Sequence, residues 1–384
     1  MQEGSHEADA DRTMISTSAM YAEAAKSYEP RDHYLHILEG THAGLRLKLG
    51  PRPFVIGRRS DCDLPIADTQ VSARHCELSL TPLGPQLVVR DLGSTNGTFV
   101  EGERVNGAAS LPPGGMMRLG GETIRHEYLL RSEAERDDLH QRDLDKARHY
   151  VESLLPQPIA AGPIATDWVY VPSAQLGGDA FGYHQLSEER FCGYLMDVSG
   201  HGVGAAMHSV SVMNVMRQRA LPDCDFNDPG QVLARLNDMF GMEAHDGMYF
   251  SMWYGVYDIA RRTLRYASGG HHASYLVDAG RSRMTPLRTR NLVIGAMPGA
   301  PFSSSEVEVE PGSTLYVFSD GVFEVVGADG AQKGLPDFLP FLMQPRAVEG
   351  SEAKRIESAV RDSARPGPLE DDFTLLTVTF VSSG

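Results

Sequence analysis

The chain has 384 residues, of which 41% are hydrophobic and 22% are charged, a balance typical of globular rather than disordered proteins. This length predicts two or three domains. The 35 Lys and Arg against 51 Asp and Glu give a formal net charge of −16, and residues 159–384 alone carry −10. Because no basic patch offsets this charge, we expect no binding to nucleic acid and none to an anionic membrane.

The sequence also argues against secretion and against a membrane span. No apolar run approaches the roughly 18–20 residues that cross a bilayer, and the opening residues MQEGSHEADADR are too polar and acidic for a secretory signal. The four cysteines, at positions 62, 76, 192 and 224, form no close pair of the kind found in zinc or redox motifs. Reduced thiols of this type predict a cytoplasmic protein.

The N-terminal third divides into two predicted segments. Residues 1–32 lack periodicity, which predicts a disordered tail. In residues 33–131 short β runs alternate with turn residues, which predicts an all-β sandwich. The predicted strands are HYLHIL, LRLKL, PFVIG, HCELSL, QLVVRDL, GTFV, MMRLG and TIRHEYLL.

Residues 132–158 are predicted to form a linker helix that ends at LPQP. Leu144, Ala147, Val151 and Leu154 are spaced by 3, 4 and 3 residues, as in a two-heptad seam. Two alternatives remain open: the seam packs on its own domain, or residues 132–155 form a homodimer.

Residues 159–384 mix strands and helices without strict alternation, which favours a layered α+β domain over a doubly wound sheet. The predicted helices cover residues 202–220, 228–240 and 352–364. The predicted strands are WVYVPSA, FCGYLMDV, YFSMWYGVYD, TLRYAS, SYLVD, EVEVE, TLYVFSD and FTLLTVTFV.

Acidic residues in this C-terminal part sit where predicted strands meet tight turns. They occur in LGGDAF, YLMDVSGHGVGAA, YVFSDGVFE and EDDFTLLTV, and are Asp179, Asp197, Asp320, Asp371 and Asp372. Several carboxylates meeting at sheet edges would repel one another, and hard divalent cations are the usual neutralising partners. Taken singly, Asp-Gly at 320–321 and GGD at 177–179 are common turn sequences.

The ordered set of LGGD, DVSGHGVGAA, SGGH, SDGVFE and DDFTLL resembles PPM-type metal-dependent serine/threonine phosphatases of the bacterial SpoIIE-like branch, over about residues 140–381. The resemblance implies two packed antiparallel sheets flanked by helices, an α/β/β/α sandwich with two Mn²⁺ or Mg²⁺ ions at one end. It implies that Asp197 bridges both ions, with the Val198 carbonyl beside it. Asp179 would bind one ion, and Asp320 and Asp371 the other, with Asp372 as the alternative to Asp371.

The resemblance further implies hydrolysis of phosphoserine or phosphothreonine by direct attack of a metal-bridging hydroxide. His201 is a candidate proton donor to the leaving group or a structural residue of its glycine-rich loop. For His271 and His272 the structural interpretation is favoured, and His272 departs from the family motif. The implied substrates are an anti-sigma-factor antagonist or a product of a Ser/Thr kinase. The competing hypothesis is a non-catalytic adaptor, which the complete acidic set disfavours.

FVIGRRSDCDL, VSARHCEL and DLGSTNGTFV, at their spacing in residues 33–131, together resemble a forkhead-associated (FHA) domain. This resemblance implies recognition of a phosphothreonine partner. Arg58, Ser72 and Thr95 would contact the phosphate, Asn96 the peptide backbone, and His75 would tie the loops together. Ala73 replaces the Arg or Asn of many members, so either Arg59 or Arg74 compensates, or binding is weakened. A degenerate domain that serves only as scaffold is the alternative.

Overall fold

The computed structural model describes residues 30–81, 84–327, 329–346, 350–365, 367 and 369–381. The predicted tail at 1–32 therefore lies almost entirely outside the described residues. The chain divides into two compact units, Met1–Arg142 and Asp143–Gly384. Among the described residues no helix is long and apolar enough to cross a membrane.

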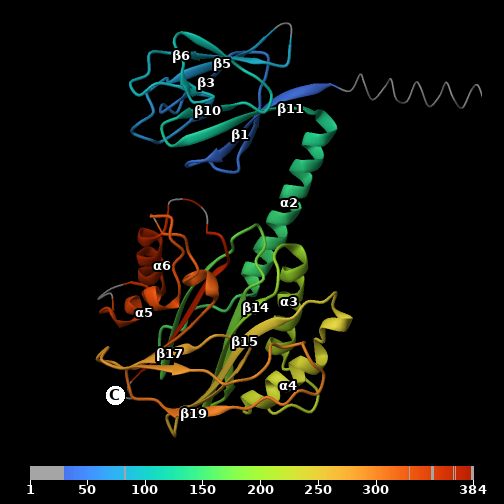
Figure 1. Cartoon of the computed structure of the whole chain (residues 1–384), viewed down its shortest axis with the longest axis vertical. Coiled ribbons are helices and arrows are strands. Elements are labelled where there is room, and N and C mark those ends of the chain that lie inside the picture. The colour runs from blue at the N-terminus through green and yellow to red at the C-terminus, as the bar shows by residue number, and fades with distance from the viewer. Residues whose placement is uncertain are drawn as a thin grey trace, which may run out of the picture. The chain divides into compact units, whose positions relative to one another are not determined.

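The N-terminal unit is a sandwich of two β-sheets, as predicted, shown at the blue end of the chain in Figure 1. One sheet has the strand order β2-β1-β11-β10-β7-β8 and the other β4-β3-β5-β6-β9. Their strands are β1 (Arg31–Glu39), β2 (Arg46–Lys48), β3 (Phe54–Gly57), β4 (Leu64–Pro65), β5 (Cys76–Leu80), β6 (Leu87–Asp91), β7 (Phe99–Val100), β8 (Glu103–Arg104), β9 (Ala108–Leu111), β10 (Met116–Leu119) and β11 (Glu122–Leu130).

Alternating apolar residues of these strands form the core of this unit. Leu35 and Ile37 of β1, Ile56 of β3 and Ile124 of β11 are fully buried. Strand β11 also buries polar residues, among them Glu122 and His126. The short strands β4, β8 and β9 were not predicted, because two-residue strands and the small residues of AASL give almost no periodic signal.

Helix α2 (Arg131–Leu154) follows β11 directly. It is continuous across the division between the two units. Its last turns pack within the C-terminal unit, where Leu144, Ala147, Val151 and Leu154 meet a small apolar cluster on α3 (Val203–Gln218). The predicted seam is thus used inside the chain, which supports the interpretation that it packs on its own domain. The homodimer stays a prediction.

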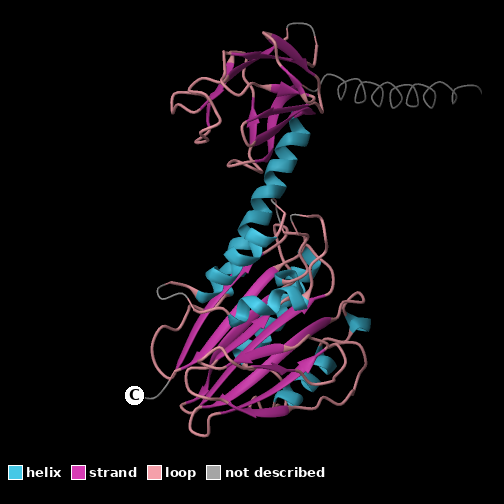
Figure 2. Ribbon diagram, turned by 60° about the vertical axis from the view of Figure 1, so that its left-hand side comes forward, coloured by secondary structure: helices cyan, strands magenta, loops and turns pink. Residues whose placement is uncertain are grey.

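The C-terminal unit contains two antiparallel five-stranded sheets. Figure 2 shows their strands as stacked layers with helices on the outside. One sheet has the order β12-β21-β20-β17-β18 and the other β13-β14-β15-β16-β19. The strands are β12 (Ile164–Val171), β13 (Ala180–Ser187), β14 (Arg190–Val198), β15 (Phe250–Asp258), β16 (Thr263–Gly269), β17 (Ser274–Val277), β18 (Met284–Leu287), β19 (Ser305–Glu308), β20 (Thr314–Phe318) and β21 (Phe373–Phe380).

Helices cover both outer faces and complete an α/β/β/α sandwich, which confirms the predicted fold class. Helices α3 and α4 (Pro229–Met239) pack on the β13-β14-β15-β16-β19 sheet, and α6 (Glu352–Ser363) packs on β12 and β21, beside α5 (Leu335–Met343) (Figure 1). The starts of α4 and α6 follow from their caps. Asp228 accepts hydrogen bonds from the N–H groups of Gly230 and Gln231, and Ser351 accepts one from Lys354.

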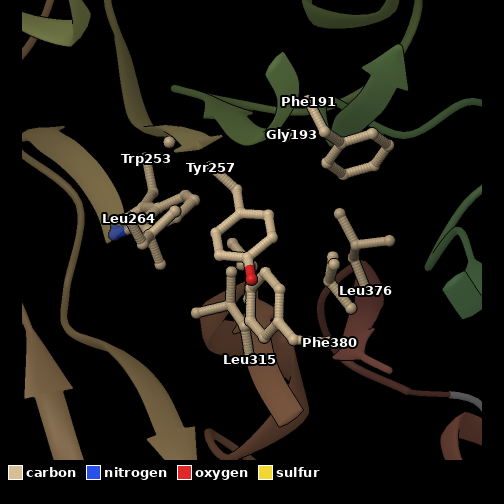
Figure 3. A pocket seen from close by; sticks show the side chains of 11 residues that line it. Phe191, Gly193, Trp253, Tyr257, Leu264, Leu315, Leu376 and Phe380 are labelled. Carbon is tan, nitrogen blue, oxygen red and sulfur yellow. The ribbon is translucent and has the colours of Figure 1, made fainter. Parts of the chain in front are cut away.

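The core between the two sheets is dense. Phe191, Trp253, Leu376 and Phe380 surround a small apolar cavity there, with Gly193 on its wall (Figure 3). Its volume of about 10 Å³ is no more than one water molecule needs, and its walls offer few polar partners. This cavity therefore has no room for a ligand.

Two strands and one α-helix that the structure describes in the C-terminal unit were not predicted. The strand β13 contains Gly182 and ends in polar residues, so its alternation is weak. The strand β18 is only four residues long. Helix α5 is not predicted because Pro340 lies inside it, and proline normally argues against a helix interior, whereas Pro336 lies in the first turn, where proline is well tolerated.

Candidate functional site

The predicted acidic residues gather at one end of the C-terminal sandwich because of strand pairing. Asp179 immediately precedes β13, and its neighbour Ala180 pairs with Met196, beside Asp197 near the end of β14. In the other sheet Asp320 follows β20, and Asp371 precedes β21, its antiparallel neighbour. One sheet thus contributes Asp179 and Asp197. The other contributes Asp320 and Asp371, with Asp372 beside Asp371.

Glycines allow the loops that carry these acidic residues to pack closely against one another. A Cβ atom at Gly177 would lie 2.4 Å from Oδ2 of Asp372, and one at Gly178 would lie 2.9 Å from the Val198 carbonyl oxygen. A Cβ at Gly321 would lie 2.3 Å from the Asp372 carbonyl oxygen. Only glycine fits at these points, which explains the glycines of the LGGD and SDG motifs.

The adjacent residues Asp371 and Asp372 have different environments. Both carboxylate oxygens of Asp372 accept hydrogen bonds: Oδ1 from the N–H and hydroxyl of Ser173 at 2.7 and 2.8 Å, and Oδ2 from the Gly178 N–H at 2.7 Å. Asp372 is buried, whereas Asp371 is exposed and accepts a 2.8 Å hydrogen bond from the Asp372 N–H. Because the carboxylate oxygens of Asp372 are already engaged in hydrogen bonds, Asp371 is the stronger candidate for a metal ligand.

The carboxylates are close enough to disturb one another's ionisation. Burial, then repulsion from Asp197 and Asp372, raises the pKa of Asp179 well above its usual range. Burial, then repulsion from Asp320 and Asp371, raises the pKa of Asp197 to about 8. Oδ2 of Asp179 is buried and has no hydrogen-bond partner among the described residues. A buried carboxyl oxygen without a partner, surrounded by other carboxyl groups, fits a cation, whose charge would favour the ionised form.

The carboxylates are not, however, already arranged round one ion position. In the parts of the chain that the structure describes, no group of three or more His, Cys, Asp or Glu side chains is placed to hold a metal ion.

The histidines of the motifs differ in exposure. His201 is exposed, between Gly200 and Gly202, whose φ angles of 91° and 82° need glycine. Although the surface of Asp371 is exposed, the surrounding protein partly desolvates its carboxyl group and so raises its pKa, as Asp320 does, whereas the charge of His201 lowers it. His271 is buried, and burial, followed by the effect of His272, holds its pKa well below the usual value. This neutral, enclosed His271 fits the structural role favoured for it.

His272 also lies in an apolar setting. Its ring contacts Phe318 and Phe323, with centroids 4.9 and 5.1 Å away, and burial lowers its pKa. Its Nδ1 lies 2.9 Å from the carbonyl oxygen of Ala273. These contacts explain how a second histidine is accommodated at this position.

Two residues at this end of the sandwich were not singled out from the sequence. Glu324 is exposed, and its N–H donates to the Asp320 carbonyl at 2.8 Å. Partial desolvation of its carboxyl group, then repulsion from Asp320 and Asp371, raises its pKa. The sequence could have indicated Glu324, because it is the last residue of the SDGVFE motif. Ser173 binds Asp372 across 199 positions of sequence, and no local pattern could have indicated that contact.

In the N-terminal unit, backbone contacts bring three predicted loops together. The Arg58 N–H donates to the Ser72 carbonyl at 2.9 Å, and the Thr95 N–H donates to the Ser72 hydroxyl at 3.1 Å. The Asn96 amide donates to the Gln70 carbonyl at 2.8 Å. Arg58, Thr95 and Asn96 are exposed and Ser72 is partly so. The predicted phosphopeptide-binding residues therefore share one loop cluster.

Buried His75 stands beneath these loops. Its Nδ1 accepts a hydrogen bond from the Ser72 N–H at 3.1 Å, and its Nε2 lies 3.2 Å from the Gly97 carbonyl oxygen. At the position of Ala73 many FHA domains have an Arg or Asn that contacts the ligand. Two nearby arginines could supply that contact here. One of them, Arg59, pairs with Asp61 at 2.8 Å. That pairing makes the other, Arg74, which is also exposed, the better substitute.

Comparison with known proteins gives two family matches. The model described as Stage II sporulation protein E (SpoIIE) matches residues 187–381. The FHA domain model matches residues 54–120. Both agree with the resemblances drawn from the motifs.

Relatives match each half of the chain separately. Over 189 residues, 48% of this chain and 46% of the relative, the sequence is 27% identical to "Phosphoserine phosphatase RsbP" of Bacillus subtilis (strain 168). Over 90 residues, 23% of this chain and 57% of the relative, it is 42% identical to "FHA domain-containing protein FhaB" of Mycolicibacterium smegmatis. The chain thus spans about half the length of these curated relatives.

A solved structure shares the fold of the C-terminal unit. The SiaA-PP2C domain of Pseudomonas aeruginosa aligns with a TM-score of 0.53 at 18% identity, over 66% of this chain and 100% of that domain. At this identity the likeness establishes the fold alone.

Proposed function

The chain belongs to the SpoIIE family, and from this we propose that it is a metal-dependent phosphatase acting on phosphoserine or phosphothreonine in proteins. The observation that carries the proposal is the cluster of carboxylates from both sheets, in which the pKa of Asp197 is raised to about 8 by burial and by its acidic neighbours. Without a bound cation, such a cluster of like charges destabilises the folded protein, whereas a cation would be bound favourably by it.

Four carboxylates would hold two Mn²⁺ or Mg²⁺ ions in this proposal. Asp197 would bridge them beside the Val198 carbonyl, Asp179 would bind one, and Asp320 and Asp371 the other. When bound, such ions supply an activated water for direct attack on phosphorus and offset the charge on the phosphoryl oxygens. The orphaned Oδ2 of Asp179 supports this assignment, because it lacks a partner among the described groups.

The remaining residues would position these ligands and move a proton. Asp372, hydrogen-bonded to Ser173 and Gly178, would fix the loop that carries Asp179. His201, exposed and near enough to Asp371 to affect its pKa, would donate a proton to the leaving alkoxide of the substrate.

The relative named a phosphoserine phosphatase supports phosphoserine proteins as the substrate class. An anti-sigma-factor antagonist or a product of a Ser/Thr kinase would fit. The FHA unit would recruit phosphothreonine partners through Arg58, Ser72, Thr95 and Asn96, and so target or regulate the phosphatase. A cytoplasmic location stays a prediction.

The proposal is tested with the full chain and a protein phosphorylated on serine. Release of phosphate should require Mn²⁺ or Mg²⁺ and should stop when EDTA is added. If the chain binds a phosphothreonine peptide but releases no phosphate with either ion, the adaptor hypothesis replaces this one.

A further inference from the structure

A second cavity lies on the helix-covered face of the β13–β14 pair. It has a volume of about 220 Å³ and is lined by the last turn of α2, by α3 and by both strands. The helices α2 and α3 lie side by side at this point (Figure 1). Tyr194 lines the cavity, whereas Gly193 and Phe191 line the small cavity between the sheets. Since side chains alternate along β14, Asp197 lies on the opposite face from Tyr194.

Tyr194, which lines the cavity, carries a buried hydroxyl that lacks a partner. Tyr194 is fully buried, and its hydroxyl has no hydrogen-bond partner among the residues described. A Cβ at Gly182, which also lines the cavity, would lie 2.5 Å from that hydroxyl oxygen. The glycine thus makes room for the tyrosine, whose unpaired hydroxyl costs free energy in the empty protein.

The cavity also has one available positive charge. Arg217 lies in the last turn of α3, is exposed, and has no ion-pair partner within the described part of the chain. Burial raises the pKa of Tyr194, and the charge of Arg217 opposes this rise, so the two groups interact. Burial and the charge of Arg219 lower the pKa of His184 to about 4, which leaves His184 neutral at pH 7.

The remaining residues that line the cavity are apolar or have polar groups that already make hydrogen bonds. Leu155, Phe181 and Met213 are buried and offer hydrocarbon surface. The hydroxyl of Tyr183 donates to the Gln157 carbonyl at 2.7 Å. A complementary molecule would therefore have an apolar body, one anionic group and one hydrogen-bonding group.

We propose that this cavity binds a small apolar monoanion, whose charged group pairs with Arg217 and whose polar atom contacts the hydroxyl of Tyr194. Its volume is below the roughly 300–1,000 Å³ of pockets for drug-sized ligands, so the ligand is of single-ring size. The site is separate from the acidic end, and it stands whether or not the chain is a phosphatase.

Calorimetric titration of the full chain with 4-hydroxybenzoate tests the proposal, with benzoate and uncharged benzyl alcohol as comparisons. We expect a Kd of about 1 mM or tighter for 4-hydroxybenzoate, weaker binding of benzoate, and none of benzyl alcohol. Arg217→Ala should weaken binding about tenfold or more. Arg235→Ala, which changes an exposed arginine of α4, is the matched control and should have no effect.

Tyr194→Phe removes only the hydroxyl, and so it should bind 4-hydroxybenzoate no better than benzoate. Because the unpaired group is gone, this variant should melt at the same temperature as the wild type or higher, which separates a defect in binding from a defect in folding. Equal binding by the wild type, Arg217→Ala and Tyr194→Phe would overturn the proposal. Absence of binding by the wild type would overturn it as well.

Discussion

The carboxylate of Asp372 accepts a 2.7 Å hydrogen bond from the backbone N–H of Gly178, which lies 194 positions earlier in the chain. This contact joins the segment that precedes β21 in one sheet to the loop that precedes β13 in the other. Because Asp179 follows Gly178 directly, Asp372 fixes where the Asp179 carboxylate stands. In the proposed site, Asp371 would bind an ion, and Asp372 would position the loop that carries Asp179.

Substitution of the paired acids separates these two roles. Asp372→Ala should destabilise the fold by about 2–4 kcal/mol, because it leaves the buried N–H of Gly178 and the partly buried N–H of Ser173 without their acceptor. Asp371→Ala should change stability by less than about 1 kcal/mol, because that carboxylate is exposed, yet it should weaken Mn²⁺ binding. Urea unfolding and calorimetric metal titration measure the two effects. The reverse pattern would mean that the roles have been assigned to the wrong residues.

Two glycines of the core should respond differently to a methyl group. A Cβ at Gly255 would lie 2.3 Å from the Trp253 ring, so Gly255→Ala should cost about 1–3 kcal/mol. At Gly193, on the wall of the cavity in Figure 3, the nearest atom would be 3.9 Å away. Gly193→Ala should therefore change the free energy of unfolding by less than about 1 kcal/mol. Urea denaturation compares them, and equal losses would contradict this account of the core.

Much of the fold could be predicted because the pattern is local. The runs around Val88, Leu195 and Leu376 follow the period and length of strands, and the predicted helices begin at recognisable caps such as Asp228. The strand β13 and helix α5 could not be predicted from local pattern, because Gly182 disfavours a strand and Pro340 disfavours the interior of a helix. Packing in the finished sandwich outweighs those preferences.

In the candidate site too, local motifs could be predicted and contacts between distant parts of the sequence could not. Asp179, Asp197, Asp320 and the pair at 371–372 were recognisable because each lies at a strand end in a motif. The choice between Asp371 and Asp372 was not recognisable, because it depends on hydrogen bonds from Ser173 and Gly178 that connect distant parts of the sequence. The cavity at Tyr194 could not be foreseen either, because it needs the packing of α2 and α3 on the sheet.

His184 should make stability depend on pH. Burial, with the charge of Arg219, holds its folded-state pKa at about 4, below the ordinary value of 6.5. Between these values the unfolded chain binds more protons, so stability should fall as the pH drops from about 6.5 to about 4. The loss due to His184 should be about 1–2 kcal/mol, allowing for its partial exposure.

His184→Gln cannot titrate and should lose less stability over the same range. Urea unfolding of both proteins at pH 7 and pH 4.5 measures the difference between them. If the two proteins lose the same stability, His184 does not have a lowered pKa.

The loop cluster of the N-terminal unit predicts a contrast between two arginines. Arg58→Ala should weaken binding of a phosphothreonine peptide by roughly 10–100-fold, the effect of losing a charge-assisted hydrogen bond to phosphate. Arg52 precedes β3, at the opposite end from Arg58, and pairs with Asp63 at 2.8 Å, so Arg52→Ala should bind normally. Fluorescence anisotropy measures both affinities. Equal affinity of the two variants would favour the interpretation of this unit as scaffold.

The most direct test of the central claim is the rate of Mn²⁺-dependent p-nitrophenyl phosphate hydrolysis by the wild type and by Asp197→Asn. The proposed site predicts a rate that disappears with EDTA and falls roughly 100-fold or more in the variant. Asp246→Asn is the matched control, because Asp246 is exposed and its φ of 52° suits asparagine, and its rate should be normal. Equal rates for the wild type and Asp197→Asn would contradict the assignment of the acidic cluster as the catalytic site.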